Sequence, residues 1–453
     1  MWNNSPPDSS EYIGTNTIVA QASAKGRSGV SVIRVSGTLV SEIAESILGR
    51  LPSPRVAFYS KFSSKNKKVI DLGLAIYFPG PNSFTGEDVI EFHGHGGVYI
   101  TQLLIKEILS LGAKIASPGE FTMRAFLNEK MDLAQAEAVA DVIDAASEAS
   151  AKSALRSLEG VFSAKINELL KSITDLRVII EACFDFPEED IDFLAELNVK
   201  DKIFEIINCI DSIKNKAKQG VLLKEGVTLA IVGQPNVGKS TLLNSLSGID
   251  SAIVTNIAGT TRDLIKESIQ INGVPINLVD TAGLCETSDV VEKQGINRSL
   301  GVLEKADHIL YVCDSTENMP AKFFKIIETY KHVTTKVVNK IDLSGKKPCV
   351  DDGVVYICAK NNDGIEQLKD HLLKLFGYKY SSDQFIARRR HVDALKRTRD
   401  FCQKAYECFA NGAGAEFMAY ELKQAQLCIS EITGAFTSDD LLGEIFSNFC
   451  IGK

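Results

Sequence analysis

The stretch GQPNVGKS, residues 233–240, decides the fold of the central part of this chain. It fits the pattern G-x-x-x-x-G-K-S, follows the apolar run VTLAIV and precedes a segment with helical spacing. In that context, backbone N–H groups of the loop and of the helix N-terminus face phosphate oxygens. We expect Lys239 to reach the β and γ phosphates and the Ser240 hydroxyl to ligate Mg²⁺. The stretch therefore predicts a P-loop between a strand and a helix.

Two later motifs also end apolar runs that are typical of parallel strands. DTAG at 280–283 follows INLV, which places Asp280 near Mg²⁺ and the Gly283 N–H near the γ-phosphate. NKID at 339–342 follows another such run, and the Asp342 carboxylate can accept two hydrogen bonds from the guanine edge. Adenine lacks that pair of donors, so the motif predicts GTP rather than ATP as the ligand.

Between these motifs lies AGTTRD, residues 258–263, in which Thr260 and Thr261 can cap the nucleotide. Thr261 is the predicted second Mg²⁺ hydroxyl. The predicted GTP site consists of Asn236, Val237, Gly238, Lys239, Ser240, Thr241, Thr255, Asn256, Ile257, Ala258, Gly259, Thr260, Thr261, Asp280, Thr281, Ala282, Gly283, Asn339, Lys340, Ile341, Asp342, Cys358, Ala359 and Lys360.

Two positions lack the groups that Ras-like GTPases use for hydrolysis. Leu284 follows DTAG where a glutamine orients water in Ras-like switches, and leucine cannot polarise water. Arg262 is the only arginine close to the switch, and an ordinary ion pair is the simpler interpretation of it. Another group must therefore orient the water and balance the charge.

The composition is that of an ordinary globular protein. The chain has 453 residues, 45% of them hydrophobic and 24% charged. Its net charge of −8 argues against a protein that binds nucleic acid over most of its surface. None of the ten cysteines form Cys-x-x-Cys, so we expect reduced thiols in a cytoplasmic protein. Residues 1–12 are polar and predict a disordered tail without signal-peptide character, and no apolar run approaches the roughly 20 residues of a membrane helix.

The spacing of apolar residues, and with it the predicted secondary structure, changes several times along the chain. Short β-type runs fill residues 13–128, helical spacing dominates 129–222, strands alternate with helices over 223–380, and 381–453 is helical again. The fold class predicted is a multidomain α+β protein, in which an α/β P-loop GTPase domain is inserted in a helical domain after an N-terminal α+β domain.

Several stretches together resemble the MnmE (TrmE) family of tRNA-modification GTPases. They are SFTGEDVIEFHGHGG at 83–97, PGEFTMRAFLNEKMDLAQAEAVADVIDA at 118–145, the P-loop, NIAGTTRD at 256–263 and the ending GEIFSNFCIGK. The resemblance covers the chain from about residue 17 to its end. It implies that the N-terminal domain binds a tetrahydrofolate derivative (5,10-methylene or 5-formyl) and forms a homodimer.

In this family, potassium takes the place of an arginine finger. The resemblance assigns K⁺ to Asn236 and Thr260, with the backbone carbonyls of Thr255 and Ile257. A fixed cation at the β–γ bridge meets the negative charge that builds up when that bond breaks. Glu292 matches the glutamate that organises the attacking water. Without the resemblance, it would be interpreted as a solvent-exposed charged residue on a helix.

The folate site rests on the resemblance alone. Arg34, Glu91 and Lys130 match its binding positions, and Lys453 contributes from the C-terminal end. A carboxylate suits the N–H edge of a pterin, and cations suit a glutamate tail. Each could equally form an ordinary ion pair, and the histidines of HGHGG are a weak indication of a metal.

Cys450 lies four residues from the end, where prenylated proteins carry their modified cysteine. Lys453 and Gly452 fit that motif poorly, so we expect no membrane anchor. In the family this cysteine is required for modification, and a thiol near a lysine can be a nucleophile. Packing beside Phe449 and Ile451 is the alternative.

Two functions of different class remain. The first is a GTP hydrolase that, in a heterotetramer with a FAD-containing MnmG/GidA flavoprotein, installs a (carboxymethyl)aminomethyl group at C5 of the wobble uridine (U34) of certain tRNAs. Methylene-tetrahydrofolate would supply the carbon. The second is a regulatory switch GTPase that binds RNA or the ribosome and needs neither Cys450 nor a folate site. The basic stretch at 387–400 is either a tRNA contact or a solvated helix face.

Overall fold

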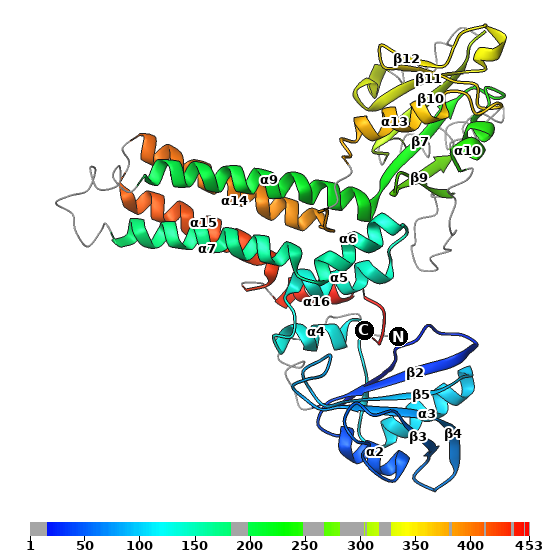
Figure 1. Ribbon diagram of the computed structural model, residues 1–453, viewed down its shortest axis with the longest axis vertical. Coiled ribbons are helices and arrows are strands. Elements are labelled where there is room, and N and C mark those ends of the chain that lie inside the picture. Colours follow the sequence, from blue (N-terminus) through cyan, green and yellow to red (C-terminus); the bar gives the residue numbers. More distant parts are fainter. Residues whose placement is uncertain are drawn as a thin grey trace, which may run out of the picture. The chain divides into compact units, whose positions relative to one another are not determined.

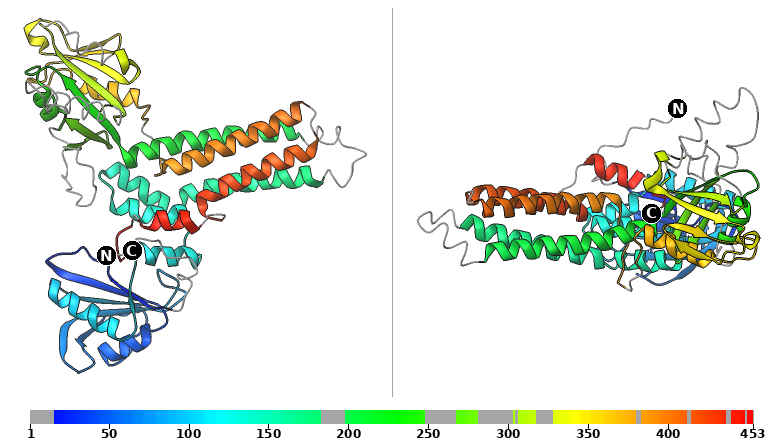
Figure 2. Two further views of the ribbon diagram at one scale, coloured as in Figure 1. Left: turned by 180° about the vertical axis from the view of Figure 1, so that it is seen from behind. Right: turned by 90° about the horizontal axis from the view of Figure 1, so that it is seen from above.

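The computed structural model describes residues 16–182, 198–247, 267–280, 303, 306–316, 328–379, 383–411, 414–435, 439–447 and 449–452 (Figures 1 and 2). The chain forms two compact units. Unit 1 comprises Met1–Ala140, Ser157–Ile210 and Ala394–Lys453, and unit 2 comprises Asp141–Arg156 and Asp211–Asp393. Each unit is therefore assembled from segments that lie far apart in the sequence.

Unit 1 begins with a six-stranded sheet in the order β3-β4-β5-β2-β1-β6, in which only the β1–β6 pair is parallel. Its core gathers the inward residues of the strands and the apolar sides of two helices, including Ile33, Ile43, Phe62, Phe92 and Ile108. The elements are β1 Ile18–Gln21, β2 Ser28–Ser36, α2 Val40–Leu48, β3 Phe58–Ser63, β4 Val69–Phe78, β5 Val89–Gly96, α3 Val98–Ser110 and β6 Lys114–Ile115.

Strand alternation places polar side chains on the sheet face opposite that core. In the antiparallel register of β2 and β5, Arg34 stands opposite Glu91 and Val32 opposite His93. The alternate residues Ile33, Ile90 and Phe92 are buried. Register alone therefore brings Arg34 and Glu91 together from positions far apart in the chain.

The helical part of unit 1 is built around α7 (Val161–Ala182), which packs along α15 (Ala415–Thr433) (Figure 1). Buried residues of α7 recur every three or four positions, from Phe162 through Ile166 and Leu169 to Ile180. Other helices with residues in this unit are α4 Glu120–Leu127, α5 Leu133–Ile143, α9 Val199–Glu225, α14 Arg389–Ala410 and α16 Asp439–Ser447. Within the part of the chain that the structure describes, no helix is long and apolar enough to span a membrane.

The C-terminal residues pack against the start of α4. Phe446 and Phe449 are buried with Met123 and Leu133, and the Gly119 N–H donates to the Cys450 carbonyl at 3.4 Å. A β-bridge pairs Pro118 with Ile451. The end of the chain is therefore held on the segment that leads into α4.

Unit 2 contains a seven-stranded sheet in the order β12-β13-β11-β10-β7-β9-β8. The five inner strands are parallel and the two edge strands are antiparallel to their neighbours. The elements are β7 Val227–Gly233, α10 Lys239–Ser247, β8 Glu267–Ile271, β9 Val274–Asp280, β10 His308–Asp314, β11 Thr334–Asn339, β12 Cys349–Asp351, β13 Val354–Tyr356 and α13 Ile365–Leu375.

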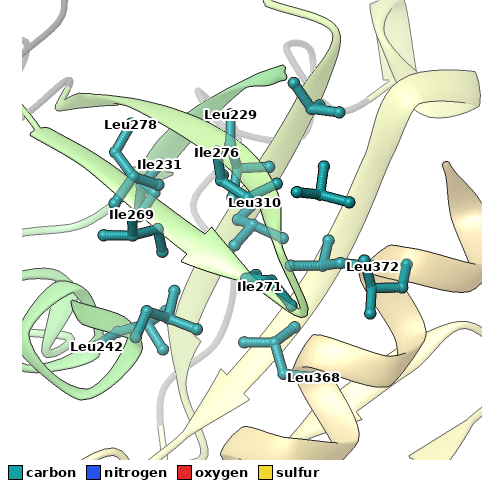
Figure 3. Packing of buried hydrophobic residues seen from close by; sticks show 14 of the residues in the cluster. Leu229, Ile231, Leu242, Ile269, Ile271, Ile276, Leu278, Leu310, Leu368 and Leu372 are labelled. Carbon is teal, nitrogen blue, oxygen red and sulfur yellow. The ribbon is translucent and has the colours of Figure 1, made fainter. Parts of the chain in front are cut away.

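The inner strands read as nearly continuous apolar runs because both faces of such a sheet are covered. Leu229 and Ile231 of β7 pack with Leu310 of β10 and with Leu368 and Leu372 of α13 (Figure 3). This core lies below the carboxyl ends of the parallel strands, and ligands bind beyond such ends in open α/β sheets.

A helix from far earlier in the sequence completes unit 2. Ala154 of α6 (Glu148–Leu158) belongs to the sheet core, and the Ile386 N–H donates to the Ser153 carbonyl at 3.3 Å. The Ser147 hydroxyl donates to the Gly273 carbonyl at 2.7 Å and accepts from the Ser150 N–H at 3.0 Å. Ser147 therefore caps α6 and holds the β8–β9 turn at the same time.

The predicted fold class is confirmed. The runs VTLAIVG, INLVDTAG, HILYVCD, TKVVNK and VVYICAK supply β7, β9, β10, β11 and β13. Helices precede this sheet in the sequence and follow it, after an N-terminal α+β part. The domain limits at 12, 128, 222 and 380 stay predictions, while the compact units meet at 140, 156, 210 and 393.

Acid is expected to destabilise unit 2 through His308. Its ring is buried, lies edge-on to Phe376, and Nε2 lies 2.8 Å from the Thr335 hydroxyl. Burial, and then the charge of His371, lower the pKa of His308 from 6.5 to about 4. The unfolded chain therefore binds more protons between those two values, and stability falls by about 2 kcal/mol between pH 7 and pH 5.

Urea unfolding at pH 7 and pH 5 measures this effect. His308→Gln should shift its midpoint less between the two pH values than the wild type does. His332→Gln, at an exposed position of the same unit, should behave as the wild type. Equal shifts for the wild type and His308→Gln would contradict this origin of the acid sensitivity.

Candidate functional site

The P-loop connects the end of β7 to the start of α10. Asn236 has φ 64° and Gly238 has φ 93°, which turns the backbone sharply between Gly233 and Lys239. The Lys239 ammonium donates to the carbonyls of Gly233 at 3.0 Å and Gln234 at 2.7 Å. The cation therefore lies against its own loop, next to the backbone that the motif assigns to phosphate.

Asn339 links the P-loop to the other end of the nucleotide site. It is buried, its Nδ2 donates to the Val237 carbonyl at 2.9 Å, and its Oδ1 accepts from the Ala359 N–H at 3.0 Å. The Ser245 hydroxyl of α10 donates to the Ala359 carbonyl at 2.7 Å. One side chain thus fixes the phosphate loop relative to the residues predicted for guanine.

The guanine end is organised around Asp342 and Cys358. The buried Cys358 thiol donates to Asp342 Oδ1 at 3.2 Å. Burial, followed by the hydrogen bond to Asp342, raises the pKa of Cys358, so the sulfur keeps its proton and remains a donor. The exposed Asp342 carboxylate is therefore held in one orientation at the surface of unit 2.

Lys340 adopts φ 60°, and its ammonium pairs with Asp314 Oδ2 at 2.7 Å. Burial by itself would raise the pKa of Asp314. Hydrogen bonds from Lys340 and Thr316 outweigh this effect and keep the pKa below its usual value. Asp314 was missed by sequence reasoning, although a carboxylate at the end of the run HILYVCD was a usable signal. It holds the backbone between Asn339 and Asp342.

The structure describes some of the other residues predicted to bind GTP, and the rest lie outside the described part of the chain. Ser240 and Thr241 lie in the first turn of α10, Lys360 is exposed after Ala359, and Ile341 is buried. Asp280 is the last residue of β9. The following residues lie outside the described part of the chain: Thr255, Asn256, Ile257, Ala258, Gly259, Thr260, Thr261, Thr281, Ala282, Gly283, Glu292 and Lys453.

A second polar site lies on the sheet of unit 1. Arg34 Nε donates to Glu91 Oε1 at 2.9 Å, and His93 Nε2 lies 3.1 Å from Glu91 Oε2. The hydrogen bond with His93 is the main cause that lowers the pKa of Glu91, burial opposes it, and Arg34 adds to it. The carboxylate is therefore ionised at neutral pH.

Two aromatic rings flank this ion pair. The Arg34 guanidinium lies 5.3 Å from the ring centre of Phe84 and 5.8 Å from that of Phe121. These distances are within the range of cation–π contacts. Phe84 and Phe121 belong to two of the stretches that carry the family resemblance, yet sequence reasoning singled out neither ring.

Lys130 and Cys450 approach the same part of unit 1. The Lys130 stem packs against Gly86, two residues after Phe84. Cys450 is exposed, and its carbonyl accepts from Gly119, two residues before Phe121. Phe449 beside it is buried with Phe446, Met123 and Leu133, and the choice between a nucleophile and a packing residue at Cys450 stays a prediction.

The comparisons with known proteins cover both units. The model of the MnmE helical domain matches residues 133–450, and that of the GTP-binding protein TrmE N-terminus matches residues 17–130. The tRNA modification GTPase MnmE of Coxiella burnetii (strain RSA 493 / Nine Mile phase I) is 50% identical over 98% of this chain and 100% of that protein. The protein of the same name from Proteus mirabilis (strain HI4320) is 48% identical over 97% and 99%. The chain belongs to the MnmE family.

Solved structures also match part of the chain. An Era variant of Aquifex aeolicus bound to GDP.AlF4- is 28% identical, covering 39% of this chain and 66% of that chain, with a TM-score of 0.28. The family resemblance derived from the motifs is confirmed by the MnmE relatives, and so is the prediction of a GTPase.

The last guanine motif reads Cys358-Ala359-Lys360, and the family resemblance implies a serine in place of Cys358. Because the thiol donates to Asp342, cysteine retains a hydrogen-bond donor at this position. A thiol is a weaker donor than a hydroxyl.

The two remaining sequence hypotheses concern histidines and arginines. His93 contacts Glu91, and His95 Nδ1 lies 2.7 Å from Asp71, but no group of three metal-ligating residues occurs in the residues described. In the basic stretch, Arg388 pairs with Asp141 at 3.0 Å, Arg389 with Glu225 at 2.6 Å, and Arg397 with Glu431. These ion pairs reduce the positive charge that is available for binding tRNA, and the contact between this stretch and tRNA stays a prediction.

Proposed function

We propose that this chain is a potassium-dependent GTPase that, with a FAD-containing MnmG/GidA partner, installs a (carboxymethyl)aminomethyl group at C5 of U34 in certain tRNAs. Methylene-tetrahydrofolate is the proposed carbon source. Full-length relatives named tRNA modification GTPase MnmE support the tRNA substrate. A tRNA substrate also supports a cytoplasmic location.

The GTP half of the proposal rests on the P-loop and the guanine end. Ser240 lies at the start of α10 beside Lys239, so its hydroxyl suits Mg²⁺, with Thr261 as the second proposed hydroxyl. Asn236 is exposed in the loop, and its amide oxygen suits K⁺ together with Thr255, Ile257 and Thr260. When bound, the cations neutralise negative charge at the phosphates. Glu292 is proposed to orient the attacking water, which Leu284 cannot do.

The modification half rests on Arg34 and Glu91. The ionised Glu91 carboxylate can accept hydrogen bonds from the N–H edge of a pterin. The partly buried Phe84 ring lies beside Arg34, the ion-pair partner of Glu91, and the fully buried Phe121 ring supports Arg34 from inside the protein. Lys130 and Lys453 are proposed to bind the glutamate tail. The observation that supports the proposal is that the Cys450 carbonyl accepts a hydrogen bond from the Gly119 N–H, two residues before Phe121, whose ring centre lies 5.8 Å from the Arg34 guanidinium. A switch GTPase needs no such arrangement.

The remaining proposals concern assembly. We place a homodimer at the N-terminal domain, with GTPase domains that pair across potassium, and a heterotetramer with the flavoprotein. GTP hydrolysis in KCl and in NaCl at equal ionic strength tests the role of Asn236. Equal rates would reject it.

Cys450→Ser is expected to abolish tRNA modification and leave GTP hydrolysis unchanged. Unmodified tRNA is incubated with GTP, KCl, methylene-tetrahydrofolate, glycine and the flavoprotein, and the wobble nucleoside is then weighed by mass spectrometry. Cys209→Ser, which changes another exposed cysteine of unit 1, is the matched control and should modify tRNA normally.

The outcomes separate the two classes of function. Modification by Cys450→Ser at the wild-type rate would make Cys450 a structural residue. Wild-type protein that hydrolyses GTP and adds nothing to tRNA would favour the switch GTPase instead.

A further inference from the structure

A buried charge cluster lies beside the proposed folate site and includes none of the residues assigned to it. Arg124 of α4 is 4% exposed, and its Nη1 donates to both oxygens of Glu87 at 3.0 and 3.1 Å. Its Nη2 donates to Glu120 Oε1 at 2.8 Å. Two carboxylates therefore share one guanidinium, which is the side chain best suited to such paired contacts.

The hydrogen bonds around this cluster join a loop to a helix. Glu87 Oε2 also accepts from the Ser36 hydroxyl at 2.7 Å, and that hydroxyl lies 2.7 Å from the Thr85 hydroxyl. On the other side, Glu120 Oε2 accepts from the Ser117 N–H at 2.8 Å. Arg124 thus connects the loop at 84–87 to the start of α4.

The two segments that are joined carry the rings beside Arg34. Phe84 precedes Thr85 and Glu87 in the loop, and Phe121 follows Glu120 in α4. At the far end of α4, Asn128 Nδ2 donates to the Thr85 carbonyl at 2.7 Å. The loop therefore cannot move relative to α4 without breaking charge-assisted hydrogen bonds, which are stronger than hydrogen bonds between neutral groups.

We propose that Arg124, Glu87 and Glu120 are positioning residues of the folate site. They hold the loop that carries Phe84 and Gly86 against α4, which carries the buried Phe121, so that both rings stay near Arg34 and Gly86 stays against the stem of Lys130. The inference rests on the proposed folate binding, and none of the three charged residues contacts the ligand in it. A ligand that enters a site whose loop is already held in place loses less free energy to ordering the protein.

Binding of 5-formyl-tetrahydrofolate to the full-length chain, measured by calorimetry, tests the proposal. Glu87→Gln preserves shape and an acceptor for Ser36 but removes the ion pair, and the Kd should rise about tenfold. The unfolding midpoint without ligand should fall, because a buried ion pair is broken, but the variant should be folded at the temperature of the titration and hydrolyse GTP at the wild-type rate. Arg124→Lys should recover only part of the affinity that Arg124→Gln loses, since lysine keeps the charge but not the paired contacts. Glu431→Gln removes another bidentate arginine pair of unit 1 and should not change the Kd.

Each outcome decides the question. Absence of binding by the wild type would overturn the folate proposal itself, whereas binding by the wild type and Glu87→Gln with the same Kd would overturn only the positioning role. If Glu87→Gln is not folded at the temperature of the titration, Ser36→Ala decides instead, since it removes the hydrogen bonds of Ser36 to Glu87 and Thr85 and leaves all three charges. An unchanged Kd for that variant would then reject the proposal.

Discussion

Asp342→Asn is expected to lower the affinity for GTP about a thousandfold. The carboxylate is predicted to accept two hydrogen bonds from guanine, and an amide would replace one acceptor by a donor that faces another donor. Cys358 fixes the orientation of this side chain from a buried position, so it cannot rotate freely to escape the mismatch. Xanthosine triphosphate carries an oxygen in place of the guanine amino group, and the variant should bind it more tightly than GTP.

Titration with a fluorescent GTP analogue, in competition with each nucleotide, measures both affinities. Asp351→Asn changes an exposed carboxylate in β12 of the same unit and should bind GTP as the wild type does. If Asp342→Asn keeps its affinity for GTP, the guanine contact has been assigned to the wrong residue.

Gly238→Ala is expected to lower GTP affinity about a hundredfold and to destabilise unit 2 by about 3 kcal/mol. Its φ of 93° is unfavourable for any residue with a Cβ atom, and that atom would lie 2.4 Å from Asn339 Nδ2. Asn339 would have to move, and its hydrogen bonds to Val237 and Ala359 would then break. Both the phosphate loop and the guanine end lose their common support.

Gly345→Ala separates the two causes. Gly345 has φ 68°, but an added Cβ atom meets nothing within 4 Å. It should therefore show only the backbone penalty, about 1 kcal/mol, and normal GTP affinity. Unfolding in urea and nucleotide titration of both variants provide the measurement, and identical GTP affinities would refute the steric argument.

The GTPase fold could be predicted from the sequence because its signals are local. A glycine-rich turn has to follow a strand and open a helix, and apolar runs that end in Asp280 or Asn339 mark the carboxyl ends of parallel strands. The link that Asn339 makes between Val237 and Ala359 was not predictable. Val237 lies 102 positions before Asn339 in the chain, and only the packed sheet brings the two together.

The N-terminal site illustrates the opposite case. Arg34 and Glu91 could be named only through family resemblance, because strand register, which places them opposite each other, has no local signature. Phe84, Phe121 and the cluster around Arg124 looked like ordinary apolar and charged residues of a loop and a helix. Their roles depend on contacts between these segments, which spacing does not reveal.

The origin of α6 has a consequence for the order in which the protein can fold during synthesis. Residues 141–156 leave the ribosome well before the first strand of the seven-stranded sheet, and Ile386 follows the last strand. Until translation has passed Ile386, the core of unit 2 in which Ala154 is buried is incomplete. Because a domain folds as a unit once its chain is available, unit 2 forms late, and α6 is synthesised well before the sheet against which it packs.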